Sequence, residues 1–93
     1  MLKTNEYFDG KVKSIAFDTK EKPATVGVMA PGEYVFNTDD KEKITVISGQ
    51  LEIQFKDQHS TAIYNAGESF EVDGNSSFSV GVIGNTAYLC VYG

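Results

Sequence analysis

Short stretches in which apolar and polar residues alternate run through most of this 93-residue chain. In residues 50–56, Leu51, Ile53 and Phe55 point one way and the polar residues between them the other, because successive side chains of a β-strand face opposite sides. Similar runs, rich in β-branched and aromatic residues, occupy residues 11–17, 25–30, 33–36, 44–48, 62–64, 69–72, 78–83 and 87–92. They predict an all-β fold of about eight or nine short antiparallel strands, closed into a sandwich or barrel.

The length predicts one domain, residues 1–93, with no room for a second core. A chain this short removes only about 60–70% of its unfolded surface from water, so pairing with another copy is a natural way to bury more apolar area. The last run, residues 87–92, is apolar on both faces. Its second face is covered either by a partner subunit or by the same chain, as in an ordinary central strand. We expect a homodimer.

Eight basic residues against thirteen acidic ones give a net charge of −5, which argues against nucleic acid or an anionic membrane as partner. All eight are lysines, so a phosphate group must be held by lysine, hydroxyl or backbone N–H groups. The single cysteine, Cys90, rules out an internal disulfide. The first residues carry no apolar stretch typical of a signal peptide, and no run approaches the roughly 20 apolar residues of a spanning helix. We expect a cytoplasmic protein.

Two segments have the spacing of a pair of known motifs. The first runs from Glu42 through an apolar stretch to Gly49, and the second is Gly67-Glu68-Ser69-Phe70-Glu71-Val72-Asp73-Gly74-Asn75. Together they resemble the two motifs of the cupin superfamily, small β-barrels that usually hold a metal through histidines. The resemblance implies a single cupin barrel of the RmlC-like jelly-roll type.

The histidine positions of those motifs fall on Phe36, Thr38 and Phe78, and the glutamate position falls on Glu42. Phenylalanine has no electron pair to give a divalent ion, and threonine is a poor substitute for imidazole. We therefore expect no metal and no cofactor. Glu42 is either a lone ligand or a solvated glutamate at the end of an acidic stretch, and we favour the second interpretation because carboxylates are seldom buried.

Two other reactive side chains have ordinary structural interpretations. His59 is either a general acid or base or a solvent-facing residue of a hairpin loop, and nothing acidic or apolar near it in sequence favours the first. Cys90 is either a nucleophile or a small buried apolar residue. Its neighbours supply no cation to lower the pKa of the thiol, which favours burial.

Further candidate site residues lie in the first half of the chain. Lys11 and Lys13 share one strand face and could converge on a phosphate, or they could be gatekeeper lysines on a solvated edge. Tyr34 and Phe36 share a face, and such rings either fill a core or stack against a flat base. Glu33 points the other way unless a bulge turns it inward.

Several stretches together resemble the pyrimidine/purine nucleoside phosphorylases of the small cupin-like type, nearly end to end. They are Asn5-Glu6-Tyr7-Phe8, Gly10-Lys11-Val12-Lys13-Ser14-Ile15, Val26-Gly27-Val28-Met29, Gly32-Glu33-Tyr34, Thr45-Val46-Ile47-Ser48-Gly49, Ala66-Gly67 and Tyr88-Leu89-Cys90. One departure is Asp73, where the second motif commonly carries proline. The resemblance implies a metal-free cupin that cleaves purine and pyrimidine ribonucleosides with phosphate, giving the free base and α-D-ribose 1-phosphate.

Such a reaction needs a phosphate site, a donor to the departing base and support for a positively charged sugar. The predicted roles are phosphate binding by Lys11 and Lys13, hydroxyl donation by Tyr34, sugar binding by Glu33, stacking by Phe36 and Phe78, and a cavity hydroxyl from Thr38. The expected substrates are adenosine, guanosine, inosine, uridine, cytidine and thymidine, together with inorganic phosphate. The alternative is a non-catalytic, metal-free cupin that binds a small sugar or nucleoside. A metal-dependent oxygenase or isomerase is disfavoured because the histidines are missing.

Overall fold

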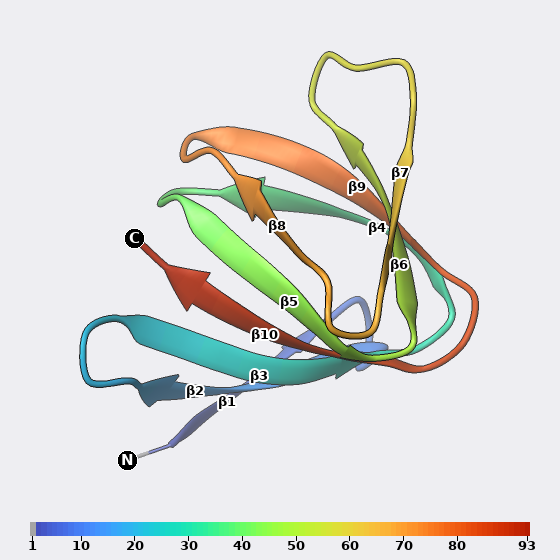
Figure 1. Cartoon of the computed structure of the whole chain (residues 1–93). Coiled ribbons are helices and arrows are strands. Elements are labelled where there is room, and N and C mark those ends of the chain that lie inside the picture. Colours follow the sequence, from blue (N-terminus) through green and yellow to red (C-terminus); the bar gives the residue numbers. More distant parts are fainter. Residues whose placement is uncertain (1) are drawn as a thin grey trace.

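The chain folds into ten antiparallel β-strands (Figure 1), seen in a computed structural model that describes residues 2–93. The strands are β1 (Lys3–Tyr7), β2 (Val12–Asp18), β3 (Pro23–Met29), β4 (Gly32–Thr38), β5 (Glu42–Ser48), β6 (Gln50–Phe55), β7 (Ala62–Asn65), β8 (Ser69–Val72), β9 (Ser76–Val82) and β10 (Thr86–Tyr92). The predicted all-β class is confirmed. Within residues 2–93, no helix is long and apolar enough to cross a membrane.

The strands form two facing sheets. One has six strands in the order β1-β2-β3-β10-β5-β8, and the other has four in the order β4-β9-β6-β7. Figure 1 shows that four connections from one sheet to the other, between β3 and β4, β5 and β6, β7 and β8, and β9 and β10, gather at one end, whereas the β4–β5 and β8–β9 connections cross at the opposite end. The core therefore lies between the sheets, and their other end is spread apart.

Strand β1 is the element that the sequence pattern missed. It pairs only with β2, from Lys3 opposite Ala16 to Tyr7 opposite Val12. Its residues are exposed on both faces apart from half-buried Asn5. An edge strand that is exposed to solvent on both faces needs no alternation of apolar and polar residues, so the sequence pattern gave no signal for β1.

The core consists of the inward-facing residues of both sheets. They include Val12, Met29, Tyr34, Ile44, Val46, Leu51, Ile53, Phe70, Val72, Phe78, Val80, Val82, Tyr88 and Cys90, all buried. Alternation along β5 and β6 explains which of their residues are buried, since every second side chain faces the opposite sheet. The β5–β6 turn also explains why glycine stands at Gly49. Its φ is +97°, and a Cβ there would lie 2.5 Å from the hydroxyl oxygen of Thr86.

Candidate active site

A cavity of about 390 Å³ opens between the two sheets. Tyr7 and Ser14 line it from the β1–β2 side, Phe36 and Phe78 from the smaller sheet, and Glu42 and Cys90 from β5 and β10. This volume falls in the range of roughly 300–1,000 Å³ that is usual for small-molecule sites. The cavity also joins apolar walls to a few polar groups, which is the composition of a binding site.

Two stacked phenylalanines form one wall. Phe36 on β4 lies directly opposite Phe78 on β9, with ring centroids 5.6 Å apart and an interplanar angle of 26°. Phe8, in the β1–β2 turn, packs edge-on against Phe36 at 5.5 Å and tilted against Tyr34 at 4.9 Å. Phe8 has a φ of +53°, which is unusual for a bulky residue, so these ring contacts help to hold a strained turn beside the cavity.

The opposite wall depends on a glycine. Gly27 on β3 pairs with Ser14 on β2 and with Tyr88 on β10. A Cβ at Gly27 would lie 2.7 Å from the hydroxyl oxygen of Tyr88 and 2.6 Å from the carbonyl oxygen of Lys13. The absent side chain therefore leaves the space in which the Tyr88 ring crosses β3 toward the β1–β2 end of the cavity.

The carboxyl group of Glu42 faces the cavity, which corrects the interpretation of this residue as a solvated loop glutamate. Glu42 begins β5, and alternation with buried Ile44 and Val46 places it on the inward face. It is only partly exposed, and the Cys90 thiol donates a hydrogen bond to its Oε1 across 3.4 Å. Burial raises the pKa of the Glu42 carboxyl, opposed by the Cys90 hydrogen bond and assisted by the negative charges of Asp39 and Asp40.

The other acidic groups around this end of the cavity keep their protons. Burial raises the pKa of the Cys90 thiol, and the neighbouring charge of Glu42 adds to the effect. Burial also raises the pKa of Tyr88 to about 12, and it raises that of Tyr92, whose hydroxyl lies 3.2 Å from that of Thr25. The cavity therefore offers protonated hydroxyl and thiol donors, and Cys90 is no thiolate nucleophile. Its predicted burial is confirmed, at 2% exposure.

Two predicted site residues use their hydroxyl groups inside the fold. The Tyr34 hydroxyl donates to the carbonyl of Ala30 at 2.5 Å, while its ring is buried. Thr38 donates to the carbonyl of Asp73 at 2.6 Å and accepts from the backbone N–H of Ser76 at 3.0 Å. Both hydroxyls are thus engaged by the backbone, and neither residue lines the cavity.

Three further predicted residues also lie outside the cavity lining. The bulge that could have turned Glu33 inward is not present, because the β4–β9 register runs unbroken from Gly32 to Thr38. Glu33 is exposed on the outer face. Lys13 forms an exposed ion pair with Glu6 at 3.5 Å, and exposed Lys11 closes the β1–β2 turn. The structure brings Phe36 and Phe78 together but does not bring these residues to them.

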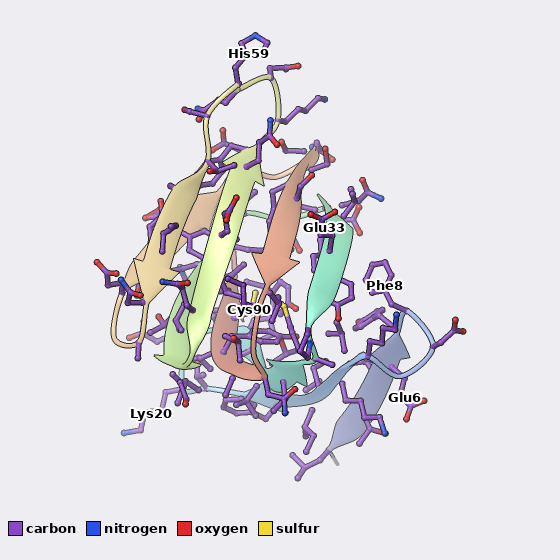
Figure 2. The ribbon with its side chains drawn as sticks, turned by 90° about the vertical axis from the view of Figure 1, so that its right-hand side faces the viewer. Glu6, Phe8, Lys20, Glu33, His59 and Cys90 are labelled. Atoms are coloured by element: carbon purple, nitrogen blue, oxygen red, sulfur yellow. The ribbon has the colours of Figure 1, made fainter. Side chains whose placement is uncertain are left out.

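Figure 2 shows Cys90 between the sheets and His59 far from it, at the outer end of the β6–β7 loop. His59 is exposed, as the sequence predicted. Within residues 2–93, no three His, Cys, Asp or Glu side chains are placed to hold a metal ion. The usual metal positions of a cupin carry Phe36, Thr38 and Phe78 beside the single carboxylate of Glu42, and this donor set does not fit a transition metal.

The sequence interpretation missed Tyr7, Ser14 and Tyr88 as cavity residues and misplaced Glu42. For Glu42, the alternation that continues back from Val46 and Ile44 was a usable signal. Tyr7 gave none, because it belongs to the strand that lacks a periodic pattern. Tyr88 was masked by a run that is apolar on both faces, so its direction was not evident before the pairing with Gly27 was seen.

The two sheets and the cavity between them define a protein of the cupin class, as predicted. The fold is similar to that of Fe(II)-HppE, with a TM-score of 0.81 and 10% identity over 99% of this chain and 56% of that one. At that level of identity only the fold is shared.

A family model described as pyrimidine/purine nucleoside phosphorylase matches residues 2–92. A relative of that name from Magnetococcus marinus is 56% identical over 93 residues, covering all of both chains. A crystal structure of a protein of unknown function from Vibrio parahaemolyticus is 46% identical, covers 99% of this chain and 98% of that one, and superposes with a TM-score of 0.96. The chain therefore belongs to the pyrimidine/purine nucleoside phosphorylase family, and the predicted resemblance is confirmed.

Proposed function

We propose that this protein cleaves purine and pyrimidine ribonucleosides with inorganic phosphate, releasing the free base and α-D-ribose 1-phosphate. Membership of the family carries this proposal, since full-length relatives at 53% and 56% identity bear the phosphorylase name. The cavity supports it, because its volume and stacked aromatic wall suit a flat base joined to a sugar. The expected substrates are adenosine, guanosine, inosine, uridine, cytidine and thymidine.

The polarity of the cavity suggests how the substrates are oriented. Conversion of a β-nucleoside to the α-phosphate requires the phosphate oxygen to approach C1′ from the side opposite the departing base. The hydroxyls of Tyr7 and Ser14 lie at the β1–β2 end, and Glu42 lies at the β5 end. We assign phosphate to the hydroxyl end and the base to the end formed by Glu42, Phe36 and Phe78. Stacking on phenylalanine discriminates little among flat rings, which fits a broad choice of base.

Lys11 and Lys13 retain a role in this proposal, outside the cavity itself. Among the described residues that line the cavity, none is a lysine. The backbone N–H of Lys11 closes the β1–β2 turn on the carbonyl of Phe8, and Lys13 precedes Ser14 on β2, so both exposed lysines belong to the hairpin that forms the phosphate end. Charges at a rim raise the local concentration of an oppositely charged substrate, and salt weakens that effect.

The test is a panel of the six nucleosides incubated with purified protein, with and without phosphate, in which the released bases are separated and quantified. We expect base release that requires phosphate and that survives exhaustive dialysis against a chelator. Saturable nucleoside binding, measured as thermal stabilisation without any base release, would instead identify a non-catalytic binding protein. Loss of the activity on chelation would return a metal to the mechanism.

We also propose that two copies pair through the outer face of the six-stranded sheet. Ile15 on β2 lies opposite Val26 on β3, and they are 40% and 36% exposed. Val28, beside them, is 50% exposed, and half-buried Leu89 on β10 continues the apolar strip. A second copy is the occupant we expect, because a domain of this size gains most from extra burial and because a two-fold axis sets the same apolar strip of both copies against each other.

Sedimentation equilibrium tests this pairing. Val28→Lys places a charge in the apolar strip and should convert a dimer to a monomer. Val35→Lys is the matched control, since Val35 is 59% exposed on β4 of the other sheet and should leave the dimer intact. A wild-type protein that sediments as a monomer, or a Val28→Lys variant that remains dimeric, would contradict the proposed interface.

A further inference from the structure

Glu42 occupies a position that the predicted roles left unassigned. It lines the cavity at the start of β5, opposite Tyr92 on β10 and Val72 on β8. Within residues 2–93, the only side chain that hydrogen-bonds its carboxyl is Cys90, through Oε1. The same cavity is lined by the stacked pair Phe36 and Phe78, so a base lying along these rings shares the space with the carboxyl group.

Burial and the nearby negative charges favour the protonated form of Glu42, and the hydrogen bond from Cys90 opposes it. Asp39 and Asp40, in the β4–β5 loop, add negative charge, and the β10 side contributes the neutral groups Cys90, Tyr88 and Tyr92. On the β8 side Glu42 pairs with apolar Val72. The nearest basic residue in sequence, Lys41, has its own ion pair with Glu71 at 2.8 Å.

We propose that Glu42 is the catalytic acid that donates a proton to the departing base. This inference rests on the phosphorolysis proposed above. A phosphate oxygen forms a bond to C1′ while the C1′–N bond breaks and its electron pair passes to the base. The Glu42 proton moves to N7 of a purine or to the O2 carbonyl of a pyrimidine. The acid is left as a carboxylate, which takes up a proton from water before the next turnover.

The other candidate proton donors suit this role less well. The Tyr34 hydroxyl, the donor predicted from sequence, donates to the Ala30 carbonyl. The pKa of Tyr88 is raised to about 12, which makes its hydroxyl a hydrogen-bond donor but a weak acid near neutral pH. The Cys90 thiol already donates to Glu42, so it holds the carboxyl group in place with Oε1 occupied.

A definite pH dependence follows. A raised pKa keeps the Glu42 carboxyl protonated to higher pH than an ordinary glutamate, and a bound base that excludes water pushes in the same direction. The rate constant for cleavage of an ordinary nucleoside should therefore be highest below the pKa of Glu42 in the complex and should fall as pH rises through it. A nucleoside whose base needs no proton to leave should lack this dependence.

Guanosine and 7-methylguanosine form the matched pair of substrates, because the methyl group gives the second a fixed positive charge at N7. The experiment measures kcat/KM for both, at a pH at which the methylated base stays cationic, in wild type, Glu42→Gln and Glu52→Gln. Glu52 is an exposed glutamate on β6 outside the cavity, so its variant controls for loss of a carboxylate. We expect Glu42→Gln to lose about 10²- to 10³-fold on guanosine and less than ten-fold on 7-methylguanosine, with Glu52→Gln unchanged.

Any other result contradicts either the role of Glu42 or the proposed function. Equal losses on both substrates, or none on guanosine, would overturn the assignment, and so would a wild type that cleaves guanosine but not 7-methylguanosine. A wild type inactive on every nucleoside refutes the proposed function itself, which is a separate outcome. If Glu42→Gln does not fold, the wild-type pH profile decides. A fall of kcat with pH that is the same for both substrates, or that is absent from both, would exclude Glu42 as the acid.

Discussion

Substitution of Gly27 by alanine tests the packing of the cavity wall most sharply. The added methyl group would lie 2.6 Å from the Lys13 carbonyl oxygen, 2.7 Å from the Tyr88 hydroxyl oxygen and 2.8 Å from the Tyr88 Cζ. The carbonyl belongs to the sheet backbone and cannot swing away, so the strain must be absorbed by β3 and by the buried Tyr88 ring. Overpacking of this kind costs about 1–3 kcal/mol. In a domain of this size, 1 kcal/mol corresponds to about 4–8 °C in Tm.

We therefore expect Gly27→Ala to lower Tm by roughly 8–16 °C for a cost of about 2 kcal/mol, measured by circular dichroism with a matching urea titration. Gly84→Ala is the control, because a Cβ at Gly84 meets no atom within 4 Å and its backbone is not left-handed. It should stay within about 0.5 kcal/mol of wild type. Tyr88→Leu in the Gly27→Ala background should recover part of the loss. A Gly27→Ala protein as stable as wild type would refute the account of this wall.

Four further substitutions separate the candidate site residues. Tyr34→Phe should cost about 1–2 kcal/mol in urea unfolding, because the Ala30 carbonyl loses its donor, yet should keep kcat within two-fold; a hundred-fold loss would mean that this hydroxyl reaches the base. Phe78→Leu should raise KM for nucleosides about two- to ten-fold without changing KM for phosphate, since it removes half of the stacked wall. Lys11→Ala and Lys13→Ala should each raise KM for phosphate a few-fold at low salt and less at high salt; identical phosphate dependence in wild type and both variants would remove the lysines from substrate capture.

The fold was largely predictable because its strands obey a simple period. Alternation identified nine of the ten strands, and the two glycine-containing motifs indicated the cupin barrel. The exception is β1, because an edge strand exposed on both sides carries no apolar signature. The apolar β10 was also recognised, and its half-buried outer residues now form part of the strip that we assign to a second copy.

The site was predictable only where the position of a residue along its strand alone decides whether the side chain points into the barrel. Phe36 and Phe78 were placed inside the barrel by counting along the motifs, and they lie opposite each other in the structure. The hydrogen-bond partners of the side-chain hydroxyl groups could not be predicted in that way. The engagement of Tyr34 with the carbonyl of Ala30 depends on the path of a turn, and that of Thr38 depends on a loop 35 residues further along the chain. Glu42 was misread because its acidic neighbours suggested a loop, whereas it already belongs to β5.

The most direct test of nucleoside phosphorolysis by this protein is a ³¹P nuclear magnetic resonance time course with inosine and inorganic phosphate. We expect the phosphate signal to fall while a signal of ribose 1-phosphate in the α configuration grows in equal amount, and one hypoxanthine to appear for each phosphate consumed. Release of hypoxanthine with free ribose and an unchanged phosphate signal would contradict phosphorolysis, as would the absence of any reaction with inosine bound.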